Sequence, residues 1–315
     1  MHHERSFRHV QITAVGSYLP PKVVTNDELA SMVETSDQWI TSHTGIRERR
    51  WADEGTTTSE LAYQAVLDLQ RRHPCQIDGI ICATATPDHP GFPSIASILA
   101  ERLQSRGPAV DVAAGCTGFV YALEMGRLMV ASALATSVLI IGAEKLSAVL
   151  DLEDRNTCVL FGDGAAAALI EASSEELFLD SYIKSEGGGS RALTIDPNSG
   201  VITMEGRSVY TFAVRVIAET IDALLARNGL SIGDIDWIVP HQANLRIIAA
   251  CAKRYEIAEE KFYMNIDRYA NTSAASIPIA LAEMESTGLL KKGQRIMLVG
   301  FGAGLTYGGN LLIWR

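Results

Sequence analysis

Three polar side chains stand where short apolar strands pass into helical segments, and their types suit nucleophilic catalysis. Cys116 follows a strand-like run, His241 ends another, and Asn271 opens a polar turn before a helix. A cysteine sulfur can attack an electrophilic carbon, and histidine and asparagine can each donate a hydrogen bond to a developing oxyanion. The sequence therefore suggests a nucleophile site with two hydrogen-bond donors.

Cys116 has the local context of a reactive thiol. The segment Asp111–Phe119 resembles a strand, a turn of small residues and a helix that begins near Thr117. The unpaired N–H groups and the positive end of the helix dipole favour a thiolate at this place. The alternative is a buried structural cysteine, which is the usual fate of a free cysteine.

The other cysteines lack that context, and we predict structural roles for them. They are scattered, and no Cys-x-x-Cys pair occurs. The spacing favours neither a zinc site nor a disulfide framework, and free thiols indicate a reducing compartment. These residues are Cys75, Cys82, Cys158 and Cys251.

His241 and Asn271 also have structural interpretations. Of the seven histidines only His241 lies at the end of an apolar strand, but a lone core histidine is usually structural. Asn271 could be a helix N-cap. An apolar strand rather than a helix follows Gly300–Gly304, which argues against a dinucleotide-binding turn. We instead predict a tight loop that offers backbone N–H groups to an oxyanion.

The elements that must position these residues form a regular series. Short β-branched runs alternate with longer amphipathic stretches, which predicts an α/β fold with helices on both sheet faces. Strands are predicted at residues 10–15, 77–83, 109–113, 137–142, 165–172, 237–239 and 295–299. Helices are predicted at residues 58–71, 94–104, 118–134, 210–228, 244–255 and 276–287.

A weak internal repeat runs through this series. Ile77–Ile81 resembles Ile235–Val239, and each segment runs into a turn and a helix. Phe161–Gly164 and Phe301–Gly304 each precede an apolar strand. Two similar α/β halves would explain these matches, and chance matching of apolar strands is the alternative. No low-complexity linker separates the halves, so we expect one compact unit.

Composition argues against several other classes of protein. The 315 residues are 47% hydrophobic, as in globular chains, and the net charge of −10 argues against a general nucleic-acid binder. No apolar run reaches the roughly 20 residues of a membrane span. The first residues lack the apolar core of a signal peptide. We therefore expect a cytoplasmic protein.

Several motifs, spread over nearly the whole chain, resemble those of one enzyme family. Besides the Cys116 segment and the Gly300 loop, they are Thr35–Ile40, Thr44–Arg49, Phe161–Gly164, Pro240–Arg246 and Asn271–Ser276. The chain resembles the β-ketoacyl-[acyl-carrier-protein] synthase III family of the thiolase-like superfamily. Related elongating synthases carry Cys-His-His and thiolases a second cysteine, so Asn271 indicates the initiating branch.

The resemblance implies a five-layered αβαβα thiolase-like fold from two halves, residues 1–172 and 173–315, and a homodimer. It implies a decarboxylating condensation of an acyl-CoA starter with malonyl-[acyl-carrier protein], which initiates fatty acid biosynthesis. Cys116 is then the nucleophile that forms an acyl-enzyme, while His241 and Asn271 serve decarboxylation. Acyl-CoA and the acyl carrier protein are the substrates, and no metal, cofactor, nucleic acid or membrane is implied.

The resemblance also assigns supporting residues. The backbone N–H groups of Cys116 and Ala303 hold an oxyanion, and Phe301 lies beside the catalytic histidine. Trp39 and Arg155 match a pair that sandwiches the CoA adenine, by stacking and cation attraction, although core packing is the alternative for Trp39. The CoA-binding set is completed by Asn244 and by His43, which stands where many members have a phosphate-contacting arginine.

Two further sets concern the acyl chain and the carrier protein. Phe92 matches a residue that reaches the partner's acyl pocket across the dimer, and the pocket set also contains Leu160 and Phe161. A basic helix face would dock the acidic carrier protein, with a solvated face as the alternative. Its residues lie seven and eight positions apart, so they share one face: Arg246, Lys253 and Arg254.

Other positions depart from the family pattern. Ala270 and Ala303 replace glycines, Tyr307 replaces a tryptophan, and the loop near Gly187–Pro197 is short. An alanine at position 270 costs energy if that residue needs a positive φ. Two other functions stay open, namely a specialised acyltransferase or starter-condensing enzyme of secondary metabolism, and a non-catalytic acyl-binding subunit. The Cys-His-Asn set argues against the latter.

Overall fold

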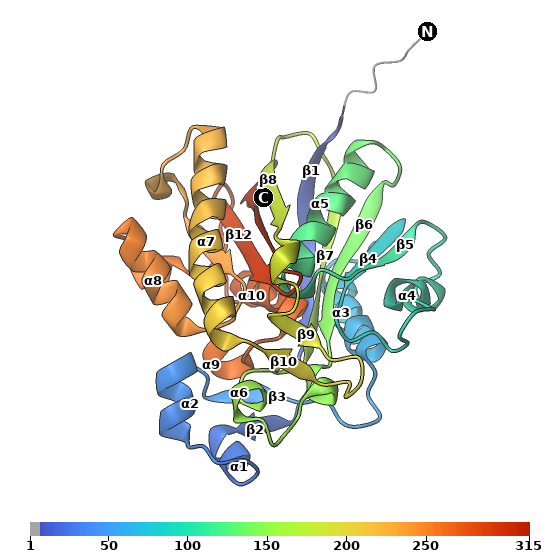
Figure 1. Cartoon of the computed structure of the whole chain (residues 1–315). Helices are drawn as coiled ribbons and strands as arrows, with labels where there is room; N and C mark the ends of the chain where they lie inside the picture. The colour runs from blue at the N-terminus through green and yellow to red at the C-terminus, as the bar shows by residue number, and fades with distance from the viewer. Residues whose placement is uncertain (1–6) are drawn as a thin grey trace.

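The computed structural model describes residues 7–315, and its first sheet has five strands in the order β1-β7-β6-β4-β5 (Figure 1). Strand β4 pairs in parallel with β5 and β6, whereas β7 is antiparallel to both β1 and β6. The strands are β1 (His9–Tyr18), β4 (Gly79–Ala83), β5 (Ala109–Val112), β6 (Ser137–Glu144) and β7 (Gly164–Ser173).

The second sheet repeats this arrangement with four strands in the order β8-β13-β12-β11. Strands β11 and β12 are parallel, and the other two pairs are antiparallel. Position by position, β8, β13, β12 and β11 correspond to β1, β7, β6 and β4. The strands are β8 (Phe178–Ser185), β11 (Trp237–Pro240), β12 (Arg295–Gly302) and β13 (Thr306–Ile313).

Six helices complete the layers. Helices α5 (Gly118–Ala131) and α10 (Ser276–Ser286) pack between the two sheets. Helices α3 (Thr58–Arg72) and α4 (Ile95–Arg102) cover the outer face of the first sheet. Helix α7 (Gly206–Asn228) covers the second sheet and packs against α8 (Leu245–Tyr255). The predicted five-layered αβαβα fold is confirmed.

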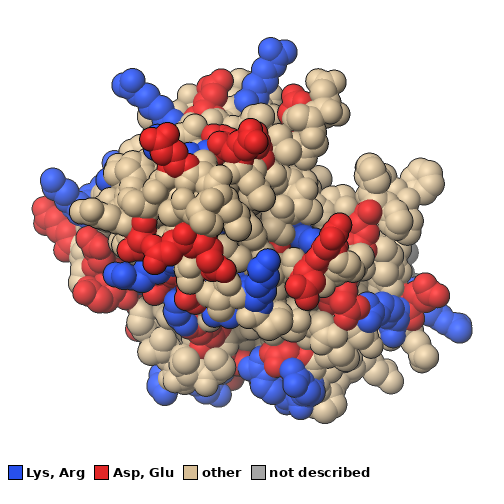
Figure 2. All heavy atoms as spheres, turned by 90° about the horizontal axis from the view of Figure 1, so that it is seen from below, with Lys and Arg blue, Asp and Glu red and all other residues tan. Residues whose placement is uncertain are grey.

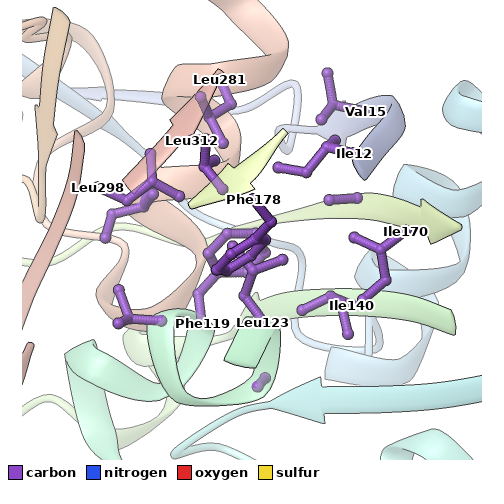
Figure 3. Close-up of a cluster of buried hydrophobic side chains, with 14 of the residues drawn as sticks. Ile12, Val15, Phe119, Leu123, Ile140, Ile170, Phe178, Leu281, Leu298 and Leu312 are labelled. Atoms are coloured by element: carbon purple, nitrogen blue, oxygen red, sulfur yellow. The ribbon is translucent and has the colours of Figure 1, made fainter. Parts of the chain in front are cut away.

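The main core lies where the central helices meet both sheets. Figure 3 shows Phe119 and Leu123 of α5 among strand residues of the first sheet, Ile140 and Ile170. In the same cluster Leu281 of α10 lies with strand residues of the second sheet, Leu298 and Leu312. Burial of these side chains fixes the positions of both central helices, and both helices begin at the candidate site.

A small lobe lies below the sheets in Figure 1. Buried Arg49 ties it together, because its guanidinium donates to Asn26 Oδ1 at 2.8 Å and to the Val159 carbonyl at 2.9 Å. Its short elements include α1 (Asn26–Ala30), α2 (Asp37–Thr44), β2 (Val23–Thr25), β3 (Glu48–Arg50), α6 (Arg155–Cys158) and α9 (Ile266–Tyr269). A hairpin of β9 (Leu193–Ile195) and β10 (Ile202–Met204) adjoins the lobe.

The structure contains every strand and helix that the sequence predicted, with ends shifted by a few residues. The short elements of the lobe and the β9–β10 hairpin were not predicted, and β9 lies inside the expected loop near Gly187–Pro197. Among residues 7–315, no helix is long and apolar enough to cross a membrane. On the face seen from below, acidic and basic side chains are interspersed (Figure 2).

Candidate active site

Cys116 lies in a single 3-10 turn, Gly115–Thr117, between strand β5 and helix α5. Its side chain is almost fully buried. Gly115 has a φ of +51°, and a Cβ on Gly302 would lie 3.1 Å from Cys116 Sγ. Glycine at these two positions therefore lets the surrounding backbone approach the sulfur closely.

Burial raises the pKa of the Cys116 thiol to about 12. A hydrogen bond from the Ser273 side chain lowers this pKa, the nearby Glu144 carboxylate raises it, and the backbone N–H groups of Cys116 and Ala303 lower it again. Loss of hydration thus acts against the thiolate that the helix N-terminus is expected to favour. The role of Cys116 as a nucleophile stays a prediction.

His241 directly follows strand β11, and its backbone N–H donates to the Val299 carbonyl at 2.8 Å. The buried ring meets Phe301 edge to face, with centroids 5.2 Å apart, so the structure places Phe301 where it was expected. Its Nδ1 lies 2.8 Å from Ser276 Oγ. Burial lowers the pKa of His241 to about 3, so the imidazole is neutral near pH 7 and one of its ring nitrogens carries a hydrogen.

Hydrogen bonds to both the backbone and the side chain of Asn271 fix its position. Its N–H donates to the Leu160 carbonyl at 2.9 Å, and its carbonyl accepts from Gly162 at 3.0 Å. Its side-chain Oδ1 accepts from the Ser273 N–H at 2.8 Å, so the donor end, Nδ2, is the end left for a ligand. The preceding Ala270 has a φ of +57° and a ψ of −155°, a region that glycine almost alone adopts.

Two cavities meet at Cys116. One has a volume of about 250 Å³ and is mainly apolar; besides Cys116 it is lined by Thr84, Ala85, Ala113, Gly115, Leu146, Phe161, Leu193, Thr194, Ile195, Ile202, Ser273, Ala303 and Gly304. The other has a volume of about 190 Å³ and contains His241, Asn271 and Phe301. It extends to Tyr210 of α7 and Ile247 of α8. The sulfur can therefore reach molecules in either cavity.

The three predicted acyl-pocket residues occupy different places. Phe161 lines both cavities, whereas Leu160 lines only the one that contains His241 and Asn271. Phe92 lines neither of these cavities and is 92% exposed. Leu160 therefore lies away from the apolar cavity, and the roles of Leu160 and Phe92 in acyl binding stay predictions.

The predicted CoA residues cluster around the Trp39 ring. His43 stacks on this ring with centroids 4.5 Å apart, and the Arg155 guanidinium carbon lies 5.0 Å from the ring centroid. A flat base can enter between Trp39 and Arg155 only if the guanidinium moves away. Asn244 donates from Nδ2 to the His43 carbonyl at 3.0 Å, so its side chain also joins α8 to α2.

The predicted docking residues are all exposed on α8, but two of them are engaged. Arg246 donates to the Ser42 carbonyl of α2 at 3.0 Å, and Arg254 pairs with Asp222 of α7 at 3.0 Å. Lys253 makes no salt bridge with any of the residues from 7 to 315. The free positive charge of this face is therefore smaller than three side chains would supply.

Sequence reasoning assigned no role to three residues beside the nucleophile. Ser273 and Ser276 belong to a quoted motif, but only their contacts reveal what they do. Glu144, at the end of β6, is fully buried and accepts from Ala85 N–H at 3.0 Å and Thr86 Oγ at 2.8 Å. Burial raises its pKa. A charged residue that ends an apolar strand was the available signal.

No cluster of three or more histidine, cysteine, aspartate or glutamate side chains within residues 7–315 is placed to hold a metal ion. The groups of the site that can take part in a reaction include the thiol, the imidazole, the amide and the backbone N–H groups.

Two family models match the sequence. The model described as 3-oxoacyl-[acyl-carrier-protein] synthase III matches residues 110–187, which contain Cys116. The model of the C-terminal part of the same family matches residues 225–314, which contain His241 and Asn271.

Full-length relatives agree with these matches. The β-ketoacyl-[acyl-carrier-protein] synthase III of Clostridium tetani is 42% identical, with 98% of this chain and 99% of the relative covered. The synthase III of Caldanaerobacter subterraneus is 44% identical, with 96% of this chain and 97% of the relative covered. The synthase III structure from Aquifex aeolicus superposes with a TM-score of 0.93 at 43% identity, covering 97% of this chain and 100% of the other. The synthase III structure from Thermus thermophilus superposes with a TM-score of 0.92 at 42% identity, covering 96% of this chain and 99% of the other.

Proposed function

The chain belongs to the 3-oxoacyl-[acyl-carrier-protein] synthase III family and is a condensing acyltransferase, and we propose how its residues divide the work. The reaction joins an acyl-CoA starter to malonyl-[acyl-carrier protein] and gives 3-oxoacyl-[acyl-carrier protein], CoA and CO₂, the step that initiates fatty acid biosynthesis. The observation that carries the proposal is the position of Cys116 between an apolar cavity and a cavity that holds His241 and Asn271.

In the first half-reaction Cys116 takes the acyl group from CoA. Cys116 loses its proton, and the thiolate attacks the thioester carbon. The carbon–sulfur bond to CoA then breaks, and the proton moves on to the CoA sulfur, so CoA leaves as a thiol. The N–H groups of Cys116 and Ala303 lie against the sulfur and are placed to stabilise the tetrahedral oxyanion.

In the second half-reaction the malonyl group loses CO₂ and the bond electrons form an enolate. Asn271 Nδ2 donates to the enolate oxygen, and an N–H of the neutral His241 ring does so as well. The enolate carbon attacks the acyl carbonyl, the bond to Cys116 breaks, and the thiolate takes up the one proton that the overall reaction consumes. Departure of CO₂ drives this step, so the proposal invokes no metal or other cofactor.

Each of the two cavities suits a different part of the acyl donor, one the acyl chain and the other the arm of CoA or of the carrier protein. The apolar cavity suits the acyl chain because Leu146, Leu193 and Ile202 line it. The other cavity leads from Cys116 toward α7 and α8, where the arm of CoA or of the carrier protein would enter. The carrier protein would then contact the basic side chains of α8 around Lys253.

We also propose that the active form is a homodimer. Strand β5 is an edge strand of its sheet, with an unpaired row of backbone groups and an exposed Val110. Phe92 is almost fully exposed, which suits a large apolar side chain that a second subunit covers.

The half-reactions can be tested separately with two variants. Asn271→Ala should acylate at nearly the normal rate but lose malonyl decarboxylation by roughly 10²–10³-fold, because it removes only an enolate donor. His241→Ala should behave in the same way, because it also removes an enolate donor and leaves the nucleophile in place. Release of CoA and of CO₂ would be measured separately. An Asn271→Ala enzyme that decarboxylates normally would contradict the assignment.

A further inference from the structure

We propose that Glu144 is a positioning residue that fixes the shape of the apolar cavity and thereby selects which acyl chains load Cys116. The inference rests on the proposed function and extends it to the choice of starter. Glu144 is the last residue of β6, is fully buried and lines neither cavity at Cys116. Its hydrogen-bond partners Thr84 and Ala85 do line the apolar cavity, so Glu144 acts on the acyl chain through them.

The segment that Glu144 holds, Thr84–Thr86, lies beside the turn of the nucleophile. It follows strand β4, which lies between β6 and β5 in the first sheet (Figure 1). Strand β4 is parallel to β5, and the Thr84 N–H donates to the carbonyl of Val112, the last residue of β5, at 3.3 Å. The Thr84–Thr86 segment and the Cys116 turn therefore leave the sheet at the same edge, where the carboxyl ends of parallel strands form binding sites.

Three hydrogen-bond donors converge on one oxygen of the Glu144 carboxylate. Oε2 accepts from the Ala85 N–H at 3.0 Å, from Thr86 Oγ at 2.8 Å and from Thr84 Oγ at 3.3 Å. Each hydroxyl oxygen also accepts a backbone N–H, Thr86 from Lys145 at 2.9 Å and Thr84 from Thr86 at 3.0 Å. A carboxylate oxygen only accepts, so the single hydrogen of each hydroxyl points to Glu144.

The other carboxylate oxygen holds a second part of the cavity wall. Oε1 accepts from the Ala274 N–H at 3.4 Å. Ala274 belongs to the turn Ser273–Ala275, and Ser273 lines the apolar cavity. Every group bonded to the two oxygens is thus a donor, which suits a carboxylate, whereas an amide would turn its NH₂ group toward one of these hydrogens. Glu144 therefore holds two segments of the wall in a fixed relation.

The position of the Thr84–Thr86 segment depends on these bonds because no cation compensates the charge. Glu144 makes no salt bridge within residues 7–315. The adjacent Lys145 donates through Nζ to backbone carbonyls of residues 53–56 instead. Buried donors and acceptors that lose their partners are costly, so loss of an acceptor position at residue 144 should make the segment move.

A fixed wall allows an apolar cavity to discriminate between acyl chains. One methylene more or less in such a cavity changes kcat/KM by about tenfold or more, because the walls fit one length and one shape. A wall that moves fits several chains about equally well. Glu144 should therefore control the ratio between starters rather than the chemistry at Cys116.

Glu144→Gln tests this control with a panel of starters. Acyl-enzyme formation is measured with acetyl-, butanoyl-, hexanoyl- and octanoyl-CoA, and the highest kcat/KM is divided by the lowest to give a selectivity ratio. This ratio should be about fivefold smaller, or less still, in Glu144→Gln than in the wild type. Loss of folded protein lowers all four values by one factor and leaves the ratio unchanged. Asp78→Asn is the control, because Asp78 holds the Thr136 N–H at 2.7 Å at the other end of β4.

Thr86 provides a second variant that leaves the carboxylate in place. Thr86→Val keeps the shape of the side chain but removes the shortest hydrogen bond to Glu144, and it should lower the selectivity ratio as well. Thr86→Ser keeps the hydroxyl and should restore the wild-type ratio. Thr13→Val removes another buried hydroxyl, which donates to the Leu169 carbonyl from β1, and should leave the ratio unchanged.

Two results would overturn the inference while acylation of Cys116 stands. One is an equal selectivity ratio in the wild type, Glu144→Gln and Thr86→Val. The other is a wild-type enzyme that loads all four starters equally well. A wild type that forms no acyl-enzyme with any of them would instead overturn the proposed function, so the two failures are distinct.

Discussion

At the scale of single residues, Cys116 is surrounded by groups that act on its proton in opposite directions. Burial and the Glu144 carboxylate favour the thiol, whereas Ser273 and two backbone N–H groups favour the thiolate. Burial prevails, and the thiol is the resting form. Attack on a thioester therefore requires that the thiol first lose its proton.

This ionisation state predicts the pH dependence of chemical modification. A thiol with a pKa of about 12 gains thiolate with rising pH, so alkylation of free Cys116 by iodoacetamide should accelerate about tenfold per pH unit between about pH 6 and 9. Peptide mass mapping would follow Cys116, with fully buried Cys82 as the unmodified internal control. A rate that levels off below about pH 8 would show a thiolate activated by the helix dipole instead.

The negative charge of Glu144 should be visible in the same assay. Glu144→Gln removes a charge that raises the pKa of Cys116, so alkylation at fixed pH should be severalfold faster. Asp163→Asn neutralises another buried carboxyl, which is not among the groups that shift this pKa, and serves as the control. Equal rates in Glu144→Gln and the wild type would remove Glu144 from the account.

The catalytic residue types could be predicted from the sequence, but their ionisation could not. Cys116, His241 and Asn271 stand at recognisable junctions, but local pattern left a structural role open for each, and the family resemblance supplied their catalytic roles. The contacts of Glu144 and Ser276 join residues far apart in the chain. Local sequence describes neither the burial that raises the pKa of Cys116 nor the contact between Ser276 and the imidazole.

At the scale of elements, the turn before α10 carries strain. Ala270 adopts a φ of +57° and a ψ of −155°, so Ala270→Gly should raise the free energy of unfolding by about 1 kcal/mol. Urea denaturation would measure the gain. Ala258→Gly, at a φ of −63°, is the matched control and should give none. The same absence of gain at position 270 would mean that the turn is not strained.

Helix α8 is the proposed docking surface for the carrier protein, and Lys253 offers its best single test. Lys253→Glu should raise the KM for malonyl-[acyl-carrier protein] severalfold while acylation by acetyl-CoA stays nearly unchanged, because it reverses one exposed charge. Lys292→Glu makes the same charge change in the segment before β12, away from Cys116, and is the control. Equal effects of the two variants would place docking elsewhere. Arg246 is less suitable because it also holds α2.

Helices and strands with a clear hydrophobic pattern could be predicted from the sequence, whereas very short helices could not. Helices such as α3 and α7 are long and amphipathic, and the buried strands are rich in β-branched residues. Helices α1, α6 and α9 span only four or five residues each. Such short elements persist through tertiary contacts, here the buried guanidinium of Arg49, which no local pattern reports.

At the scale of the whole molecule, the repeat explains how the site is assembled. The 3-10 turn at Cys116 leads into α5, and the turn at Ser273 leads into α10, the corresponding helix of the other half. These two turns contact each other between the sheets. The nucleophile and its partners, which are far apart in sequence, therefore meet because two similar halves place the starts of their central helices together.

The central claim, that Cys116 accepts the acyl group, is tested most directly by intact-protein mass after incubation with acetyl-CoA. Wild-type protein should gain the mass of one acetyl group, mapped to the Cys116 peptide, and should lose it when malonyl-[acyl-carrier protein] is added. Cys116→Ala should gain nothing while it remains folded. An acetyl group on folded Cys116→Ala, or no adduct on the wild type with any acyl-CoA, would contradict the account.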